Sequence, residues 1–326
     1  MPQVGMALST YNEMNILAAS SGVSLHDCSH PKRFAIVPQY PARVVVHRHS
    51  KLRGIRPKEL EEGLQMENRY KVGLLIICTG KYHRFMEGLY ESASKFFMNN
   101  HDVTYFFFSD QDDMKQYQNM KIIKIPHLPW PLITLMRYHF FDQYRAVLSD
   151  MDFLFCCDVD MRFVSLCCDE ILPNTSSGLV GVDHPGYCLM PRLKSKFDRL
   201  LENHLLKKIG ITPRITNKRL RGTYETNPIS TAYIAPDQGE VYYAGAFNGG
   251  RTDAFLTMCH YIKQNVNQDL SKNYIAVWHD ESHLNRYFIH HPPKTLSPSY
   301  CYPESWNLPF PKILLALDKN HHEIPR

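Results

Sequence analysis

Apolar runs alternate with amphipathic stretches from residue 71 onward. The run KVGLLIICTG ends in glycine, as expected of a strand that is buried on both faces. VTYFFFSD, KIIKI and DFLFCC predict three more strands. The segments HRFMEGLYESASKFFMNN and ITLMRYHFFDQYRAVL have helical spacing, and each predicts one helix. The alternation predicts an α/β fold, with a mostly parallel central sheet and helices on both faces.

The first part of the chain lacks this pattern. Residues 1–68 show weak periodicity and scattered prolines, and we expect an N-terminal arm or stem there. The main domain is expected over residues 69–326. No stretch approaches the roughly 20 consecutive apolar residues that span a membrane, and the N-terminus does not have the pattern of a secretory signal.

Positive charge is concentrated in one segment. The chain has a net charge of +5, whereas residues 190–222 alone hold ten Lys/Arg and two Asp/Glu, which is 10 − 2 = +8. Apolar residues in this segment recur on one helical stripe that ends near Gly210. Two interpretations are open, namely an inserted helix that packs on the domain and a basic amphipathic helix that contacts a membrane surface. Zinc-finger spacings and basic heptad regions do not occur, so nucleic acid is not expected as a partner.

Nine cysteines occur without any CxxC pair. A zinc ribbon is therefore not expected, and buried free thiols are the prediction.

Two aspartates follow the last of the predicted strands. Asp158 and Asp160 flank Val159 in FLFCCDVDMRFV. Ligands of open α/β sheets bind beyond the carboxyl ends of the strands. In an extended loop, side chains at i and i+2 point the same way, and two adjacent carboxylates favour a hard divalent cation that also binds substrate phosphates. On these residues alone, a pair of solvated loop aspartates is the simpler interpretation.

Two further stretches carry candidate chemistry. YYAGAFNGG, residues 242–250, is either a glycine-rich turn or a place where a ligand approaches the backbone closely. AVWHDESHLNRYF, residues 276–288, crowds polar groups at the start of a helical pattern. His279 and His283 at i, i+4 superficially match a zinc-hydrolase motif. However, Asp280 stands where that motif has its general-base glutamate, and Glu281 comes one residue late.

The C-terminal segment DKNHHEIPR offers cations for phosphate groups, and a solvated tail is the alternative interpretation.

Taken together, these motifs resemble one enzyme family. VDHPGY, DVDMRF, STAYIAPDQGEVYYAGAFNGG, VWHDESHLNRYF, KTLSPSY and DKNHHE are similar to motifs of the retaining α-1,3-galactosyl/N-acetylgalactosaminyl transferases. This family includes the blood-group A and B transferases, the α-1,3-galactosyltransferase and the Forssman synthase. The resemblance covers roughly residues 72–326 and implies a GT-A catalytic domain over residues 69–326, a UDP-sugar donor, Mn²⁺ and retention of anomeric configuration.

The resemblance also implies roles for individual residues. Glu281 is the implied catalytic carboxylate beneath the anomeric carbon. Asp158 and Asp160 are the implied metal ligands, and both belong with Val159 to the implied binding site of the UDP donor. The donor site otherwise comprises Ile77, Cys78, Thr79, Tyr82, Arg137, Lys319 and Arg326. The sugar and acceptor positions are His184, Ala244, Gly245, Ala246, Trp278, His279, Asp280 and Glu281.

The resemblance extends to substrates and location. Ala244 is small at a position where some galactose-using members carry Met or His, so we expect UDP-GalNAc in preference to UDP-Gal. The expected acceptor is a glycan or glycolipid, with a terminal β-galactose as the family default. Eukaryotic members are Golgi proteins, and the intact DVD motif indicates a eukaryote-like, metal-dependent enzyme in the Golgi lumen. The alternative functions are a zinc hydrolase using His279 and His283, and a catalytically silent carbohydrate-binding protein of the same fold.

Overall fold

The computed structural model describes residues 69–188 and 221–319. The predicted stem over residues 1–68 therefore lies outside the described residues. The same holds for Arg326 and for all but the last two residues of the predicted basic insertion.

A seven-stranded sheet forms the centre of the described domain, in the order β3-β2-β1-β4-β7-β6-β8. The pairings β3–β2, β2–β1, β1–β4 and β6–β8 are parallel, whereas β7 runs antiparallel to both β4 and β6. The prediction of an α/β fold with a mostly parallel sheet is confirmed. The strands are β1 (Lys71–Cys78), β2 (Asp102–Ser109), β3 (Met120–Lys124), β4 (Phe153–Cys157), β6 (Leu179–Asp183), β7 (Tyr243–Arg251) and β8 (Lys294–Leu296).

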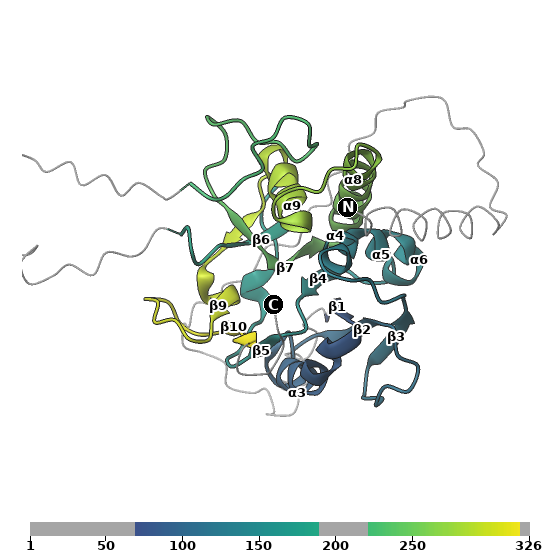
Figure 1. The fold of residues 1–326 in the computed structure, drawn as a ribbon. Helices are drawn as coiled ribbons and strands as arrows, with labels where there is room; N and C mark the ends of the chain where they lie inside the picture. The colour runs from purple at the N-terminus through teal and green to yellow at the C-terminus, as the bar shows by residue number, and fades with distance from the viewer. Residues whose placement is uncertain (1–68, 189–220, 320–326) are drawn as a thin grey trace, which may run out of the picture. The chain divides into compact units, whose positions relative to one another are not determined.

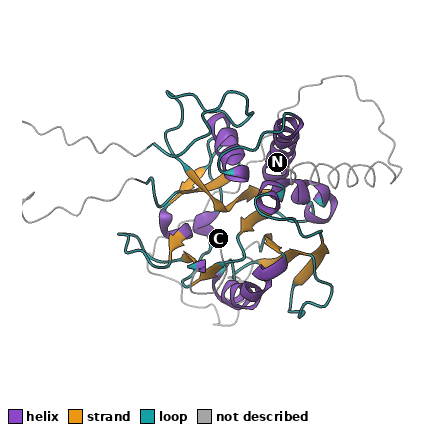
Figure 2. Ribbon diagram, viewed as in Figure 1, coloured by secondary structure: helices purple, strands orange, loops and turns teal. Residues whose placement is uncertain are grey.

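Helices cover both faces of the sheet (Figures 1 and 2). Alternate side chains of β1, such as Leu74 and Ile76, join a core with helix α3 (Met86–Phe96). The opposite face carries Phe108 of β2, whose ring packs against Phe141 of helix α5 (Arg137–Gln143) at a centroid distance of 5.1 Å. Phe141 in turn contacts Phe255 of helix α8 (Thr252–Ser271). The remaining helices are η1 (Gly80–Phe85), α4 (Leu132–Leu135), α6 (Arg145–Leu148), η2 (Asp169–Ile171), α9 (His279–His290) and η4 (Pro298–Cys301).

The prediction of one continuous helix over ITLMRYHFFDQYRAVL is wrong. The segment forms three short helices, α4, α5 and α6, which are separated at Met136 and Tyr144. Both residues have backbone angles outside the α region, with ψ of 4° and 21°. The break at Met136 makes Arg137 the first residue of α5, where its side chain is buried.

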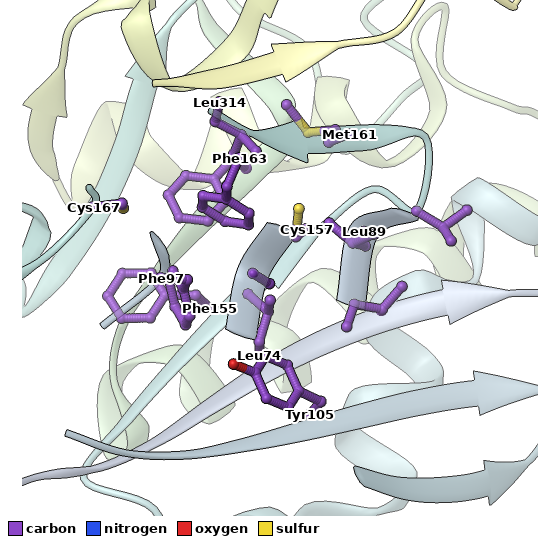
Figure 3. Packing of buried hydrophobic residues seen from close by; sticks show 14 of the residues in the cluster. Leu74, Leu89, Phe97, Tyr105, Phe155, Cys157, Met161, Phe163, Cys167 and Leu314 are labelled. Atoms are coloured by element: carbon purple, nitrogen blue, oxygen red, sulfur yellow. The ribbon is translucent and has the colours of Figure 1, made fainter. Parts of the chain in front are cut away.

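Aromatic rings fill the core on the α3 face. Phe155 of β4 stacks on Phe247 of β7 with an interplanar angle of 7°, and Phe97 meets both rings edge-on. Figure 3 shows Phe155 and Phe163 with Leu74, Leu89 and Cys157 in this cluster. This packing fixes the end of β4, and therefore the position of the DVD motif that follows it.

A second, three-stranded sheet joins the C-terminal region to the same motif. Strand β10 (Leu314–Ala316) pairs antiparallel with β5 (Met161–Phe163) and parallel with β9 (Tyr302–Pro303). Directly after β10, the Leu317 N–H donates a hydrogen bond of 3.0 Å to the Asp160 carbonyl. The residues that follow Leu317 are thereby held beside the two aspartates.

The stretch YYAGAFNGG is a strand, and the interpretation as a turn is wrong. Nearly all of it lies in β7, between β4 and β6. Its glycines serve close packing, because a Cβ at position 249 would lie 2.4 Å from the Leu154 carbonyl oxygen. The glycine content therefore reflects the approach of a neighbouring strand.

The predicted free thiols are confirmed for the described cysteines. None of these eight forms a disulfide bond, and all but Cys168 are buried. Within residues 69–188 and 221–319, no helix combines the length and apolar character needed to cross a membrane.

Candidate active site

The DVD motif forms a turn at the carboxyl end of β4. The Asp158 N–H donates to the Ala246 carbonyl at 2.9 Å, which joins the turn to β7. Val159 is buried and anchors the turn in the core. The side chain of Asp158 is 34% exposed and that of Asp160 is 10% exposed. The predicted site at the end of this strand therefore has two carboxylates with unequal access to solvent.

Arg137 connects three of the sequence motifs. Its guanidinium donates to Asp158 Oδ1 at 2.6 Å and to the Gly245 carbonyl at 2.9 Å, and its Nε lies 3.4 Å from Asp280 Oδ2. Burial lowers the pKa of Arg137, but the charges of Asp158 and Asp280 outweigh burial and raise it. The DVD turn, the glycine-rich strand and the start of α9 thus meet on one buried cation.

Asp280 is the most buried of the site carboxylates. It is 5% exposed. Burial raises its pKa to about 6, although the nearby Arg137 opposes the shift and Asp158 adds to it. A carboxyl group in this position loses its charge more easily than an ordinary aspartic acid does.

Glu281 is held by two hydrogen-bond donors. The Tyr242 hydroxyl donates to Oε1 and the Gly245 N–H donates to Oε2, each at 2.7 Å. Desolvation raises the pKa of Glu281 to about 7, while these two hydrogen bonds lower it. Gly245 lies against this side chain, because a Cβ there would be only 3.3 Å from Glu281 Cβ. The carboxylate is fixed in orientation and titrates near neutral pH.

Lys319 lies at the other edge of the site. Its Nζ is 2.9 Å from Asp160 Oδ2 and 5.3 Å from the ring centroid of Tyr82, which belongs to η1. Burial lowers the pKa of Lys319, and Asp160 more than offsets this effect and raises it. The predicted contact of Lys319 with the diphosphate region is compatible with this position.

Three of the predicted donor-site residues lie at the carboxyl end of β1. Ile77 and Cys78 end the strand, and Thr79 precedes η1. Gly80 has φ of +55° and donates its N–H to the Asp110 carboxylate at 3.1 Å. Asp110 also contacts His83 Nε2 at 2.9 Å. Asp110 and His83 were not identified from the sequence, although Asp110 is the last residue of the predicted strand VTYFFFSD.

The charge balance of the site suits a divalent cation. Four carboxyl groups can carry negative charge, those of Asp158, Asp160, Asp280 and Glu281. Two side chains are positive, those of Arg137 and Lys319, so the net charge of these six residues is 2 − 4 = −2. Burial and the charge of Asp158 raise the pKa of Asp160. Hard cations prefer oxygen ligands, and Mg²⁺ or Mn²⁺ commonly uses one or two carboxylates together with substrate phosphates. The Asp158–Asp160 pair fits this type of site.

His279 and His283 of α9 have separate surroundings. The His279 ring lies 5.2 Å from that of Trp130, and His279 itself has φ of +50°. The His283 side chain is fully buried, and its Nε2 lies 3.7 Å from Asp269 Oδ2. Among the described residues, no group of three or more His, Cys, Asp or Glu side chains is placed to hold a metal ion. The geometry therefore gives the zinc-hydrolase interpretation no support.

The remaining predicted substrate positions surround Glu281. His184 packs against Tyr242 at a centroid distance of 5.6 Å, and burial lowers its pKa to about 4. Trp278 directly precedes α9 and is 46% exposed. On β7, Ala244 is buried, and Ala246 is partly buried two residues further on. Tyr242, which holds Glu281, was quoted in the sequence motif but was not assigned a role, because its hydroxyl meets Glu281 only in the folded chain.

Comparisons with known proteins agree with this arrangement. The profile described as Glycosyltransferase family 6 matches residues 54–204 and 214–324. The chain is 32% identical over 255 residues to globoside alpha-1,3-N-acetylgalactosaminyltransferase 1 of Canis lupus familiaris, covering 74% of this chain and 64% of the dog protein. It is 31% identical over 280 residues to histo-blood group ABO system transferase 1 of Rattus norvegicus, covering 81% and 71%. It is 30% identical over 239 residues to the O-antigen biosynthesis glycosyltransferase WbnI of Escherichia coli, covering 72% and 89%.

Proposed function

Because the chain belongs to glycosyltransferase family 6, a family of GT-A fold, we propose that it is a retaining hexosyltransferase. It moves GalNAc, or Gal, from a UDP-sugar in α-1,3 linkage to a terminal β-galactoside or a related glycan. Two of the relatives named above are a globoside alpha-1,3-N-acetylgalactosaminyltransferase and a histo-blood group transferase, and their names support this reaction class.

The observation that carries the proposal is the convergence on Arg137. One buried guanidinium contacts Asp158, Asp280 and the carbonyl of Gly245, and the N–H of Gly245 holds Glu281. The carboxylates proposed to hold the metal, the donor sugar and the anomeric centre are therefore parts of one rigid assembly. Such preorganisation is the main way in which proteins stabilise charge that develops during a reaction.

In the proposed mechanism, the bond between the anomeric carbon and the diphosphate oxygen breaks, and the electron pair leaves with UDP. The acceptor hydroxyl forms the new bond to the anomeric carbon and gives its proton to the departing diphosphate. Positive charge develops on the sugar, and the Glu281 carboxylate, beneath the anomeric carbon, stabilises it. Asp280 binds hydroxyl groups of the donor sugar.

The leaving group requires neutralisation of its charge. Lys319, together with Arg326 from outside the described residues, would pair with the phosphates. Asp158 and Asp160 would hold Mn²⁺, which when bound neutralises the diphosphate as a Lewis acid. Tyr82 would place its ring against uracil, and Lys319 already lies above that ring. Donor binding would thus exchange the contact of Lys319 with Asp160 for one with phosphate.

Donor preference is assigned to the strand that contacts Glu281. Ala244 offers only a methyl group where a larger side chain would compete with an acetamido group at carbon two. We therefore propose UDP-GalNAc as the preferred donor. The membrane contact through residues 190–222 and the Golgi localisation remain predictions, the first because its residues lie almost entirely outside the described part of the chain.

A turnover assay tests the proposed function. UDP-GalNAc and UDP-Gal are each incubated with Mn²⁺ and a panel of β-galactosides, and the anomeric configuration of the product is determined by NMR. We expect an α-linked product and a loss of at least a hundredfold in kcat for Glu281→Gln. Glu87→Gln, which changes a surface carboxylate of α3, is the matched control and should retain full activity. Full activity of Glu281→Gln would remove this residue from the mechanism.

A further inference from the structure

Tyr242 is the side chain that connects Glu281 to the protein interior. It directly precedes β7 and is 1% exposed. Its hydroxyl donates the 2.7 Å hydrogen bond to Glu281 Oε1 and also bonds to the Thr223 side chain. The proposed mechanism uses the carboxylate but gives Tyr242 no part in the reaction.

The ring of Tyr242 is enclosed on several sides. The rings of Tyr224, Tyr187 and His184 lie 5.0, 5.1 and 5.6 Å from it. On a further side lies the backbone of Gly222, where a Cβ would be only 2.1 Å from Tyr242 Cγ. An overlap of this size cannot be relieved by a small shift, so a side chain at position 222 would displace the ring. The enclosure holds the ring in the position from which its hydroxyl reaches Glu281.

The hydrogen bond has an electrostatic consequence. Glu281 lies among groups of the same sign, namely Asp280 on α9 and Asp158 after β4, and the Cys301 thiol of η4 is nearby. Arg137 of α5 is bonded to Asp158 and to the Gly245 carbonyl. Two donors, Tyr242 O–H and Gly245 N–H, stabilise the ionised form of Glu281 directly, and only the first belongs to a side chain.

We propose that Tyr242 is a positioning residue for the transfer reaction: clamped against Gly222, it orients the Glu281 carboxylate and keeps it ionised beneath the reacting sugar. This inference rests on the proposed function, because it assumes that Glu281 acts as a carboxylate. A phenylalanine at position 242 would fill the same space and leave Oε1 without its donor.

The first test is the pH profile of kcat for the wild-type protein and for Tyr242→Phe, between pH 5.5 and 9. Activity requires ionised Glu281, so it falls on the acid side of a midpoint near pH 7. Loss of a hydrogen bond to the charged form moves this midpoint upward by about one to two pH units. At pH 6.5 the variant should then be about 8-fold to 75-fold slower, and about half or more of the activity should be recovered at pH 9.

The matched control is Tyr243→Phe. Tyr243 is the next residue and is also buried, and its hydroxyl bonds to Thr295 Oγ1 at 2.9 Å, whereas the hydrogen bonds to the Glu281 carboxylate come from Tyr242 and Gly245. Its midpoint should equal that of the wild-type protein. If Tyr242→Phe does not fold, Thr223→Val removes the hydroxyl partner of Tyr242 from an exposed position and should shift the midpoint in the same direction by a smaller amount.

A second readout does not need turnover. The pKa of Glu281 is raised by folding, so its contribution to stability is fully present below its ordinary value of 4.5 and is lost as pH rises through about 7. The difference in Tm between the wild-type protein and Glu281→Gln should therefore level off near pH 7. In the Tyr242→Phe background, the same difference in Tm should level off at a pH that is about one to two units higher.

The outcomes separate the two claims. A wild-type protein that transfers none of the tested sugars refutes the proposed function, while the Tm series still tests the link between Tyr242 and Glu281. Coincident profiles for Tyr242→Phe and wild type, or equal shifts for Tyr242→Phe and Tyr243→Phe, overturn the inference. An unshifted Thr223→Val overturns it where Tyr242→Phe does not fold.

Discussion

Replacement of Arg137 by methionine tests whether the three motifs depend on one cation. The change keeps a long apolar stem but removes the guanidinium from Asp158 and Asp280. Asp280 is only 5% exposed, so bulk water replaces little of the lost interaction. Removing one member of a buried ion pair costs about 3–5 kcal/mol, because the remaining charge is left without compensation. We expect the free energy of unfolding to fall by that amount.

The assay is urea unfolding followed by circular dichroism at pH 7.5 and at pH 5. The pKa of Asp280, already about 6, would rise further without Arg137. Asp280 would then be protonated at pH 5, so the destabilisation should be largest at pH 7.5 and smaller at pH 5. Arg137→Met/Asp280→Asn should recover part of the loss, since one buried charge is removed with its partner.

Arg145→Met is the matched control. Arg145 bonds to Asp142, but it is 46% exposed, and Asp142 keeps Lys263 and His260 as partners. Its loss should cost at most about 1 kcal/mol. If Arg137→Met costs no more than Arg145→Met, or if its cost does not change between pH 5 and pH 7.5, the assignment of Arg137 as the central cation is refuted.

Three further predictions concern the proposed reaction. Asp160→Asn removes one of the two carboxylates of the DVD turn and should weaken activation by Mn²⁺ at least tenfold in a metal titration, whereas Asp169→Asn, at the exposed start of η2, should leave it unchanged. Ala244→Met should lower the ratio of kcat/KM for UDP-GalNAc over UDP-Gal by about tenfold or more, because a clash with the acetamido group is worth about 1–3 kcal/mol. An unchanged ratio would show that position 244 does not determine the choice of donor sugar. In the wild-type protein, kcat should rise with pH through about 7 as Glu281 ionises, and a profile that is flat between pH 5.5 and 8 would contradict the role of its charge.

Strands β1, β2, β3 and β4 were predictable from the sequence because each is a short apolar run with no competing pattern, whereas β6 and β8 were not predicted. The helix over ITLMRYHFFDQYRAVL was not predicted correctly, since hydrophobic spacing does not report the backbone breaks at Met136 and Tyr144. The stretch YYAGAFNGG was also not predicted to be a strand. Its small residues are typical of turns, but here they admit the neighbouring strand and the Glu281 carboxylate.

Most residues of the candidate site could be identified from the sequence only through the resemblance to a family. Composition and spacing alone left Asp158 and Asp160 as ordinary loop residues. The contacts of Arg137 join residues more than a hundred positions apart in the chain, as in its bond to Gly245, and no local pattern encodes them. Tyr242 and Asp110 were missed for the same reason, since each acts by reaching a group that is distant in sequence.

The small sheet at the end of the domain has a practical consequence for handling the protein. Strand β10 completes the pairing of β5, and the Leu317 N–H fixes the Asp160 carbonyl. Truncation before Leu314 would therefore uncover Phe163 and loosen the turn that carries Asp158 and Asp160, although it removes only the last of the described strands. A proteolytic cut near residue 312 should therefore inactivate the protein while removing only a small part of its mass.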